Sequence, residues 1–256
     1  MKHFRLLKFF FPGLIGLSMS LFALALVTTA ALASTSEGGE NSINPRIVQQ
    51  VTPVAPTTLT SEQQPRYLQM FYRDPVGNSI AVIVLILMLV SLVVCLYLFL
   101  NSPASIASKG IGPGWIIPLL CILGLGVAGY LTYVEITHAR AVCGPVGDCN
   151  SVQQSPYAKL WGILPVGVLG MLGYLAILII WIIQRNIRLD SRSTITLLMW
   201  GMALFGVLFT VYLTFLEPFV IGATCAWCIS SAILITLLLW ATTGTAIQAG
   251  AAAENS

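Results

Sequence analysis

Four of the six cysteines in this 256-residue chain stand in two closely spaced pairs. Cys225 and Cys228 (the helix pair) enclose Ala-Trp, and Cys143 and Cys149 (the loop pair) enclose Gly-Pro-Val-Gly-Asp. Residues 225 and 228 are one helical turn apart, so they can close a short disulfide. At a helix N-terminus, free N–H groups and the helix dipole lower a thiol pKa from about 8.5. The resulting thiolate is suited to disulfide exchange.

Three other roles compete with redox exchange for these cysteines. Attachment of a c-type haem needs a histidine after the second cysteine, whereas residue 229 is Ile, so haem is excluded. A four-cysteine zinc site stays open, although five intervening residues in the loop pair are atypical for zinc. Two structural disulfides also stay open, although a bundle in lipid has little need of them. We favour redox exchange, with no metal site.

The composition shows which solvent surrounds these cysteines. Hydrophobic residues make up 57% of the chain and charged residues only 8%, against about 25% charged in ordinary soluble domains. This excludes a soluble globular enzyme and a disordered chain. A net charge of +3 is too small for binding nucleic acid. We therefore predict an integral, multi-pass membrane protein in contact with lipid, within which Cys95 and Cys121 pack as small apolar residues.

The apolar stretches predict the elements that position the cysteines. Six stretches lack Asp, Glu, Lys and Arg and reach the length of about 20 residues that crosses a bilayer. Backbone groups in lipid must bond within their own segment, so each stretch should be helical. We predict an all-α membrane protein whose last span is followed by a cytoplasmic tail at 244–256. The predicted spans are 79–100, 114–137, 161–183, 194–216 and 220–242.

The first apolar stretch has the layout of a secretory signal peptide. Basic residues precede it, and Ala31-Leu32-Ala33 supplies a small-residue cleavage pattern. We predict a signal peptide at 1–33, with an uncleaved anchor helix as the alternative. Residues 34–77 are rich in Ser, Thr, Pro and Gln and are predicted to be an extracytoplasmic flexible linker.

The basic residues predict the orientation of the spans. If the chain alternates from a cytoplasmic N-terminus, most Lys and Arg residues fall on the cytoplasmic side, with three Arg in loop 185–193. Both cysteine pairs then face the periplasm or a lumen, where thiols are oxidised.

A few polar residues near the cysteines also receive predictions. Ser155 is a good N-cap and Pro156 suits the first helical position, which predicts a short interfacial helix. Glu135 and His138 are three residues apart at the end of a span and could relay protons, with interfacial solvation as the alternative. Glu217 is interpreted as interfacial.

Residues from about 114 to 242 resemble a bacterial-type homologue of vitamin K epoxide reductase (VKOR). The matching features occur in family order. They are Gly129-Tyr130-Leu131-Thr132-Tyr133, the loop pair, Ser155-Pro156-Tyr157-Ala158 followed by Gly162-Ile163, and Cys225-Ala226-Trp227-Cys228. The resemblance implies a four-helix transmembrane bundle around a quinone at 112–243, with 78–101 as an additional transmembrane helix. It also implies a bacterial inner membrane or a thylakoid-type internal membrane. About a dozen residues follow the last predicted span, so we expect no fused thioredoxin-like domain and a partner in trans.

The resemblance also implies a role for each cysteine. Cys225 and Cys228 match the active-site pair, with Cys228 engaging the quinone and Cys225 exchanging with the loop. Cys143 and Cys149 match the shuttle pair, with Cys143 facing the partner. The implied quinone-binding residues are Ser155, Trp227 and Cys228. The quinone could be phylloquinone, menaquinone, plastoquinone or ubiquinone.

Taken with the residues themselves, the resemblance implies a membrane thiol:quinone oxidoreductase. It would oxidise a thioredoxin-like, DsbA-type soluble protein and so support disulfide formation. Two alternatives stay open: a disulfide-stabilised membrane scaffold or transporter subunit, and a quinone or quinone-epoxide reductase. Animal members carry Thr-Tyr-Ala after the second active-site cysteine, whereas Ile229-Ser230-Ser231 follows here, which disfavours epoxide reduction.

Overall fold

The computed structural model describes residues 65–101, 114–144, 147–160, 163–186 and 192–254. The chain divides into two compact units, Met1–Gln69 and Met70–Ser256. Of the first unit, the structure describes only the start of α2 (Arg66–Phe71). The predicted signal peptide at 1–33 and most of the predicted linker lie outside the described residues.

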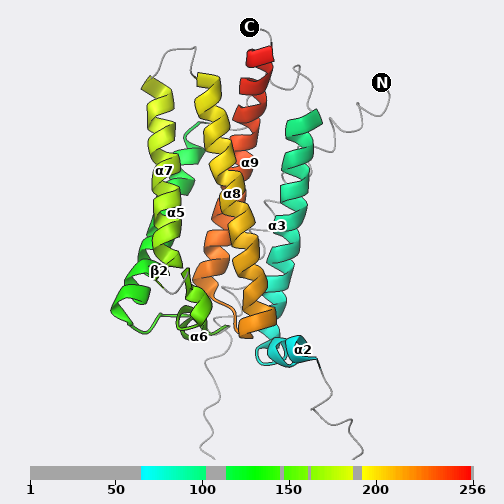
Figure 1. Cartoon of the computed structure of the whole chain (residues 1–256), viewed down its shortest axis with the longest axis vertical. Coiled ribbons are helices and arrows are strands. Elements are labelled where there is room, and N and C mark those ends of the chain that lie inside the picture. The colour runs from blue at the N-terminus through cyan, green and yellow to red at the C-terminus, as the bar shows by residue number, and fades with distance from the viewer. Residues whose placement is uncertain (1–64, 102–113, 145–146, 161–162, 187–191, 255–256) are drawn as a thin grey trace, which may run out of the picture. The chain divides into compact units, whose positions relative to one another are not determined.

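The second unit is built from five long helices, which Figure 1 shows running side by side. Each is long and apolar enough to cross a membrane, which confirms the predicted helical membrane fold. The helices are α3 (Pro75–Asn101), α5 (Ile116–Thr137), α7 (Val166–Asn186), α8 (Arg192–Leu216) and α9 (Ala226–Glu254).

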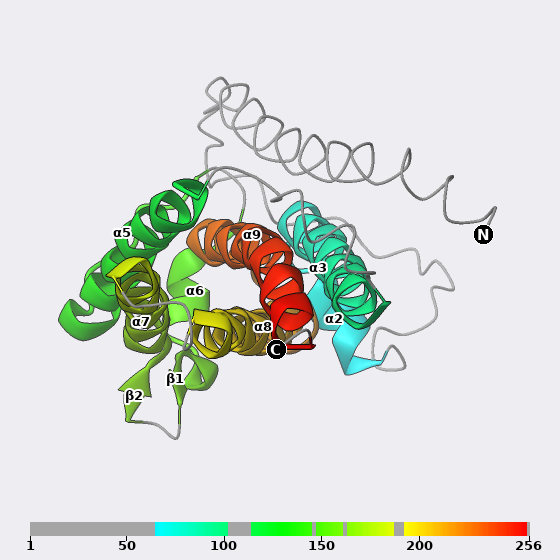
Figure 2. The same cartoon turned by 90° about the horizontal axis from the view of Figure 1, so that it is seen from above.

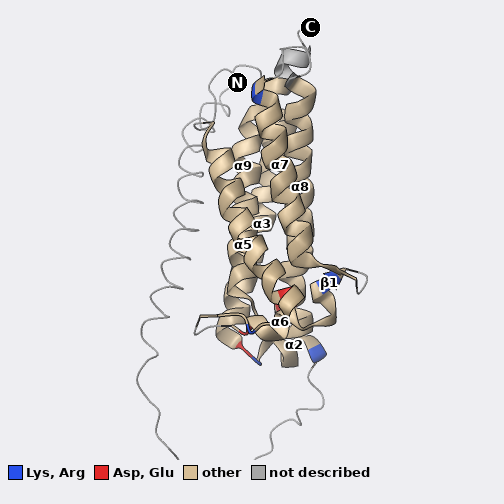
Figure 3. Cartoon of the chain, turned by 90° about the vertical axis from the view of Figure 1, so that its left-hand side faces the viewer, with Lys and Arg blue, Asp and Glu red and all other residues tan. Residues whose placement is uncertain are grey.

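Four of these helices form the predicted bundle, and α3 lies outside it. Helix α8 packs along α9 and α5 packs along α7, while α5 also contacts α9. Seen from above in Figure 2, α3 lies on the side of α8 and α9 that faces away from α5 and α7. Among the described residues, Lys, Arg, Asp and Glu are concentrated toward the ends of the bundle in Figure 3, as the membrane interior requires.

Glycines set the close approach of α5 and α7. A methyl group on Gly124 would lie 2.4 Å from the ring of Tyr174, and one on Gly167 would lie 2.7 Å from the backbone nitrogen of Thr132. Apolar burial drives helices together weakly in lipid, so contact through small residues is a main source of packing energy.

Three helices begin several residues away from their predicted starts, and one also ends far later than predicted. Helix α7 begins at Val166 instead of 161, because Leu164–Pro165 pairs with Lys159–Leu160 as a short antiparallel strand. Helix α3 begins at Pro75, inside the predicted linker, because Asp74 caps it by accepting a hydrogen bond from the Gly77 N–H at 3.0 Å. Helix α9 begins only at Ala226, after Gly222 in the left-handed conformation (φ 75°). It then continues to Glu254 through the segment predicted as a tail, whose alanine-rich sequence favours helix.

Short elements connect the long helices at the end that carries both cysteine pairs. They are α6 (Cys149–Gln153), the 3₁₀ turn η2 (Pro156–Ala158), the antiparallel strands β1 (Lys159–Leu160) and β2 (Leu164–Pro165), and the π-helical turn η4 (Glu217–Ile221). The helix predicted from Ser155 is thus one 3₁₀ turn. Ser155 makes no side-chain capping hydrogen bond there, and its carbonyl accepts the Ala158 N–H at 3.1 Å.

Candidate active site

The helix pair lies at the N-terminus of α9. Cys225 precedes the first residue of the helix, and its sulfur accepts a hydrogen bond from the Cys228 N–H at 3.4 Å. Hydrogen bonding from the Cys228 thiol lowers the pKa of Cys225, and the N–H groups of Cys228 and Trp227 add to this effect, while burial opposes it. Cys225 is therefore the thiol of this pair that is prepared to ionise.

Two side chains that the sequence did not single out for catalysis hold the helix pair. The Gln153 amide donates to the sulfurs of Cys225 at 3.8 Å and Cys228 at 3.7 Å. The Glu217 carboxyl accepts the Cys225 N–H at 3.2 Å and is only 3% exposed. The interpretation of Glu217 as interfacial is wrong, because the π-helical turn directs it inward. Gln153 had one available signal, its position one helical turn after Cys149.

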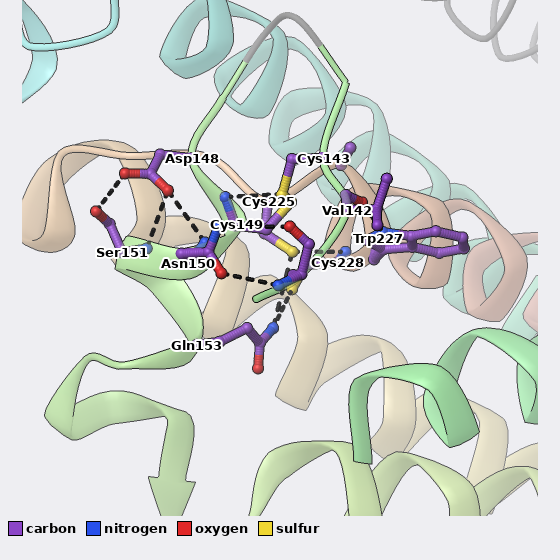
Figure 4. Close-up of a disulfide and its surroundings, with 12 residues drawn as sticks. Val142, Cys143, Asp148, Cys149, Asn150, Ser151, Gln153, Cys225, Trp227 and Cys228 are labelled. Carbon is purple, nitrogen blue, oxygen red and sulfur yellow. Dashed lines mark hydrogen bonds between the residues drawn. A yellow bond between two sulfur atoms is a disulfide. The ribbon is translucent and has the colours of Figure 1, made fainter. Parts of the chain in front are cut away.

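The loop pair is joined in a disulfide between Cys143 and Cys149. Cys149 is fully buried at the start of α6, whereas Cys143 is half-buried. Asp148 caps α6 by accepting the N–H groups of Asn150 and Ser151, both at 3.1 Å (Figure 4). The hydroxyl and N–H of Ser151, with the N–H of Asn150, lower the pKa of Asp148.

The cysteine loop is docked on the backbone just before the helix pair. The Asp148 N–H donates to the Thr224 carbonyl at 3.0 Å. Gly147 is in the left-handed region (φ 88°), and a methyl group there would lie 2.4 Å from the same carbonyl oxygen. Only glycine permits both this conformation and this contact.

Trp227 fixes the other side of the loop. Its indole N–H donates to the Val142 carbonyl at 2.9 Å, and its ring packs on Tyr130 at 4.5 Å between centroids. The Tyr130 hydroxyl in turn accepts the Val142 N–H at 2.8 Å. Trp227 thus holds the cysteine loop and is not among the residues that line the cavity described below, so its position does not support the predicted contact with quinone.

These contacts bring all four predicted cysteines into one place. Cys149 and Cys225 belong to the same buried apolar cluster, and Cys143 and Cys228 pack against it. Figure 4 shows the loop disulfide next to the sulfurs of the helix pair, which are free thiols. The remaining two cysteines, Cys95 and Cys121, are buried within α3 and α5, as predicted.

The additional helix α3 also reaches the site. Asn78 is fully buried, and its amide donates to the Phe71 carbonyl at 2.9 Å. Its amide oxygen accepts the Thr224 hydroxyl at 3.0 Å, one residue before Cys225. An asparagine in an apolar stretch gave no sign of this contact, since its partner lies 146 residues away.

A cavity of about 820 Å³, the inner cavity, lies among α5, α7, α8 and α9 next to Cys228. Its size is within the range of about 300–1,000 Å³ typical of sites for small molecules. Its wall is mostly apolar, and Ser155 Oγ and Gln153 Oε1 are buried in it without a hydrogen-bond partner among the described residues. Its polar and titratable lining residues include Glu135, Gln153, Ser155, Tyr174, Glu217 and Cys228.

The sequence between α3 and the end of the bundle also has a known counterpart. The family model of vitamin K epoxide reductase matches residues 115–243. The chain belongs to the vitamin K epoxide reductase family. The VKOR family consists of helical membrane oxidoreductases associated with quinones, so this chain is an integral membrane oxidoreductase. Helix α3 lies outside the matched range, and no curated protein matches the chain.

The inner cavity fits the ligand class of the VKOR family. A quinone is a flat apolar molecule with carbonyl oxygens that accept hydrogen bonds. The cavity offers an apolar wall, and the unpartnered Ser155 hydroxyl can donate to such an oxygen. Cys228 lies half-exposed in this wall, whereas Cys225 is fully buried behind it.

Among the described residues, no group of three His, Cys, Asp or Glu side chains has an arrangement suited to a metal ion. The disulfide in the loop pair already occupies two of the four sulfurs that a zinc site would need.

Proposed function

We propose that the chain is a membrane thiol:quinone oxidoreductase that oxidises a thioredoxin-like dithiol protein and passes the electrons to a quinone. Electrons would travel through the loop pair and then the helix pair, so that the protein supports disulfide formation. The observation that carries this proposal is the packing of a loop disulfide against two free thiols at the wall of an apolar cavity.

In the first step, the partner reduces the loop pair. A partner thiolate attacks Cys143, which is the more exposed member of the pair. The Cys143–Cys149 bond breaks and Cys149 leaves as a thiolate. The second partner thiol then displaces Cys143, so the partner leaves with a disulfide and the loop pair holds two electrons.

In the second step, the loop pair reduces the helix pair. The Cys149 thiolate attacks Cys225, its neighbour in the buried cluster, and Cys228 leaves. Cys143 then displaces Cys225 and restores the loop disulfide. The structure corresponds to the product of this step, since the loop pair is bonded and the helix pair is free.

In the third step, the helix pair closes its own disulfide and gives two electrons to the quinone, which is the oxidant. Cys228 is the member open to the cavity, and the Ser155 hydroxyl orients a quinone carbonyl. We place this end of the bundle on the periplasmic or lumenal side, on the basis of the distribution of Lys and Arg.

The test is anaerobic quinone reduction by protein that has been reduced with dithiothreitol and freed of the reductant. We expect stoichiometric loss of the ultraviolet absorbance of the quinone, and no loss with Cys228→Ser. Cys95→Ala, which removes a cysteine of α3 away from the cavity, is the matched control and should behave as wild type. If folded wild-type protein with free thiols reduces no quinone, the cysteines belong to a disulfide-stabilised scaffold and the proposal fails.

A further inference from the structure

Two carboxyl groups border the inner cavity, and only one of them borders a second cavity. Glu135 lines both the inner cavity and an outer cavity of about 380 Å³, whereas Glu217 lines the inner cavity alone. The wall of the outer cavity includes exposed residues, among them His138, Gln154 and Lys159, so this cavity reaches water at this end of the bundle. Glu135 is therefore the carboxyl group between the apolar cavity and water.

The carboxyl group of Glu135 is held in place at the start of α7. The Gly167 N–H donates to its Oε2 at 2.9 Å, and only 6% of the residue is exposed. Gly167 is in the first turn of α7, where N–H groups lack partners within the helix. A methyl group at position 167 would lie 2.8 Å from Oε2, so glycine is needed for this contact.

The burial of the Glu135 carboxyl group inside a membrane span points to a functional role. Ionisable side chains inside membrane spans are costly and usually mark a site of ion or proton movement. Glu135 lies within the apolar span of α5, where its carboxyl group accepts the Gly167 N–H and the charge of Lys159 acts on it. Glu135 also lines both cavities, and a carboxyl group with a purely structural role has no reason to do so.

The chemistry of the inner cavity requires a proton from outside the helix pair. Conversion of a quinone to a quinol takes two electrons and two protons. With Cys225 as the thiolate, the helix pair supplies both electrons but only the one proton of Cys228. The second proton must come from another group at the cavity.

We propose that Glu135 delivers this second proton and is recharged from water through the outer cavity; this inference rests on the proposed function. The Cys225 thiolate, the Cys228 thiol, the quinone and the Glu135 carboxylic acid give the Cys225–Cys228 disulfide, the quinol and the Glu135 carboxylate. Two electrons leave the two sulfurs, and the net charge of minus one is the same on both sides. The carboxylate then takes a proton from water in the outer cavity.

Other titratable groups share these two cavities with Glu135. Glu217 differs because its carboxyl group accepts the Cys225 N–H and does not line the outer cavity. The groups that line the inner cavity are Tyr157, Tyr174, Glu217 and Cys228, and those of the outer cavity are His138 and Lys159.

The test compares Glu135→Gln with wild type in a single turnover, with pre-reduced protein mixed rapidly with a ubiquinone analogue. Glutamine keeps an acceptor for the Gly167 N–H but cannot release a proton. We expect the rate of quinone reduction to fall about 100-fold, the usual order for loss of an acid–base group. Quinone binding, followed by quenching of tryptophan fluorescence, and the number of free thiols should not change. Asp74→Asn, the same chemical change at the cap of α3, is the matched control and should keep the wild-type rate.

A second readout follows the proton itself. Infrared difference spectra of the wild type on reaction with the quinone should show loss of a carboxylic-acid C=O band that shifts in heavy water. This band should be absent in Glu135→Gln and present in Glu135→Asp, which keeps a carboxyl group if the glutamine variant misfolds. The proposal is overturned by a wild-type rate in Glu135→Gln, by loss of quinone binding, or by a wild-type spectrum without the band. Failure of the proposed function is distinguishable, because the wild type would then reduce no quinone.

Discussion

The loop pair and the helix pair are built from the same residue type in one buried cluster, but the chain holds them by different means. Cys225 immediately precedes a 29-residue helix, and Cys228 is in the first turn of that helix. Cys143 and Cys149 are held by side-chain and backbone contacts from distant segments, chiefly Thr224 and Trp227. The helix pair is therefore positioned first by the start of α9, with added contacts from Gln153 and Glu217, whereas the loop pair is positioned by docking on other segments.

The difference matches the demands on the two pairs. In the proposed relay, the loop pair reacts in turn with a soluble partner and with a buried thiol, so the cysteine loop must be able to separate from Thr224 and Trp227. The few hydrogen bonds that hold it there contribute about 1 kcal/mol each, which permits this separation. A pair that donates electrons to a ligand in a cavity gains from a fixed position. The predictions below test this contrast, from the largest expected effect to the smallest.

Removal of the loop pair should separate the two halves of the relay. In Cys143→Ser/Cys149→Ser, turnover with a reduced thioredoxin-like protein should fall at least about 1,000-fold, as is usual when a catalytic nucleophile is lost. The pre-reduced variant should still reduce quinone in a single turnover, at half the amount that the wild type reduces. Full turnover with the partner would show that the partner reaches the helix pair directly. The two cysteine pairs would then not have the different roles described above.

Gly147→Ala should weaken the dock without touching a cysteine. The new methyl group meets the Thr224 carbonyl and the backbone is in the left-handed region, which costs about 1–3 kcal/mol. We expect the loop disulfide to become about 10-fold more reactive toward dithiothreitol, measured by alkylation and mass spectrometry. Gly144→Ala is the control in the same loop, because a methyl group there meets nothing within 4 Å. Equal reactivity of both variants would show that the loop is not docked.

Gln153→Leu should change the helix pair and leave the loop disulfide intact. The Gln153 amide donates to both sulfurs and helps to lower the pKa of Cys225. Its loss raises that pKa, so the thiolate should form at higher pH, with about 5-fold less thiolate at neutral pH for a bond of about 1 kcal/mol. Titration of thiolate ultraviolet absorbance measures the shift, with the exposed neighbour Gln154→Leu as control. An unchanged titration would show that Gln153 does not affect the ionisation of Cys225.

The cap of α6 should make the loop pair sensitive to acid. The pKa of Asp148 is lowered in the folded protein, chiefly by the Ser151 hydroxyl. The carboxylate therefore stabilises the loop above the usual Asp range, and this stabilisation is lost as the pH falls through the lowered pKa. Asp148→Ala should remove about 1 kcal/mol of helix capping at neutral pH, with a few-fold faster reduction of the loop disulfide. In Asp148→Asn, the rate of reduction of the loop disulfide should lie between those of the wild type and Asp148→Ala, and it should not change as the pH falls.

Much of the molecule follows from local patterns in the sequence. The five described spans were predictable because bilayer thickness fixes the length of an apolar helix. The placement of Cys225 and Cys228 at a helix start was predictable because three-residue spacing is a property of the helix itself. The helix boundaries were less predictable, since Asp74 and Gly222 act through single hydrogen bonds and one backbone angle.

Contacts between distant segments were decided only by the tertiary structure. Nothing local to Glu217 distinguishes it from an interfacial polar residue, because its contact with the Cys225 N–H depends on the π-helical turn. Gln153 had only its spacing from Cys149 as a signal, and its contacts with the two sulfurs depend on the packing of α6. Trp227 is a further case: the resemblance implied contact with quinone, whereas in the structure its indole N–H donates to the Val142 carbonyl.

The sequence alone thus determined that this is a helical membrane protein with two cysteine pairs, one of them at a helix start. Periodicity, length and spacing are local properties, and apolar composition leaves few alternatives in lipid. The tertiary structure decided which thiol meets the cavity, which one meets the loop, and which carboxyl group borders both cavities. These depend on the packing of α5, α6, α7 and α9 against one another, which no single segment encodes.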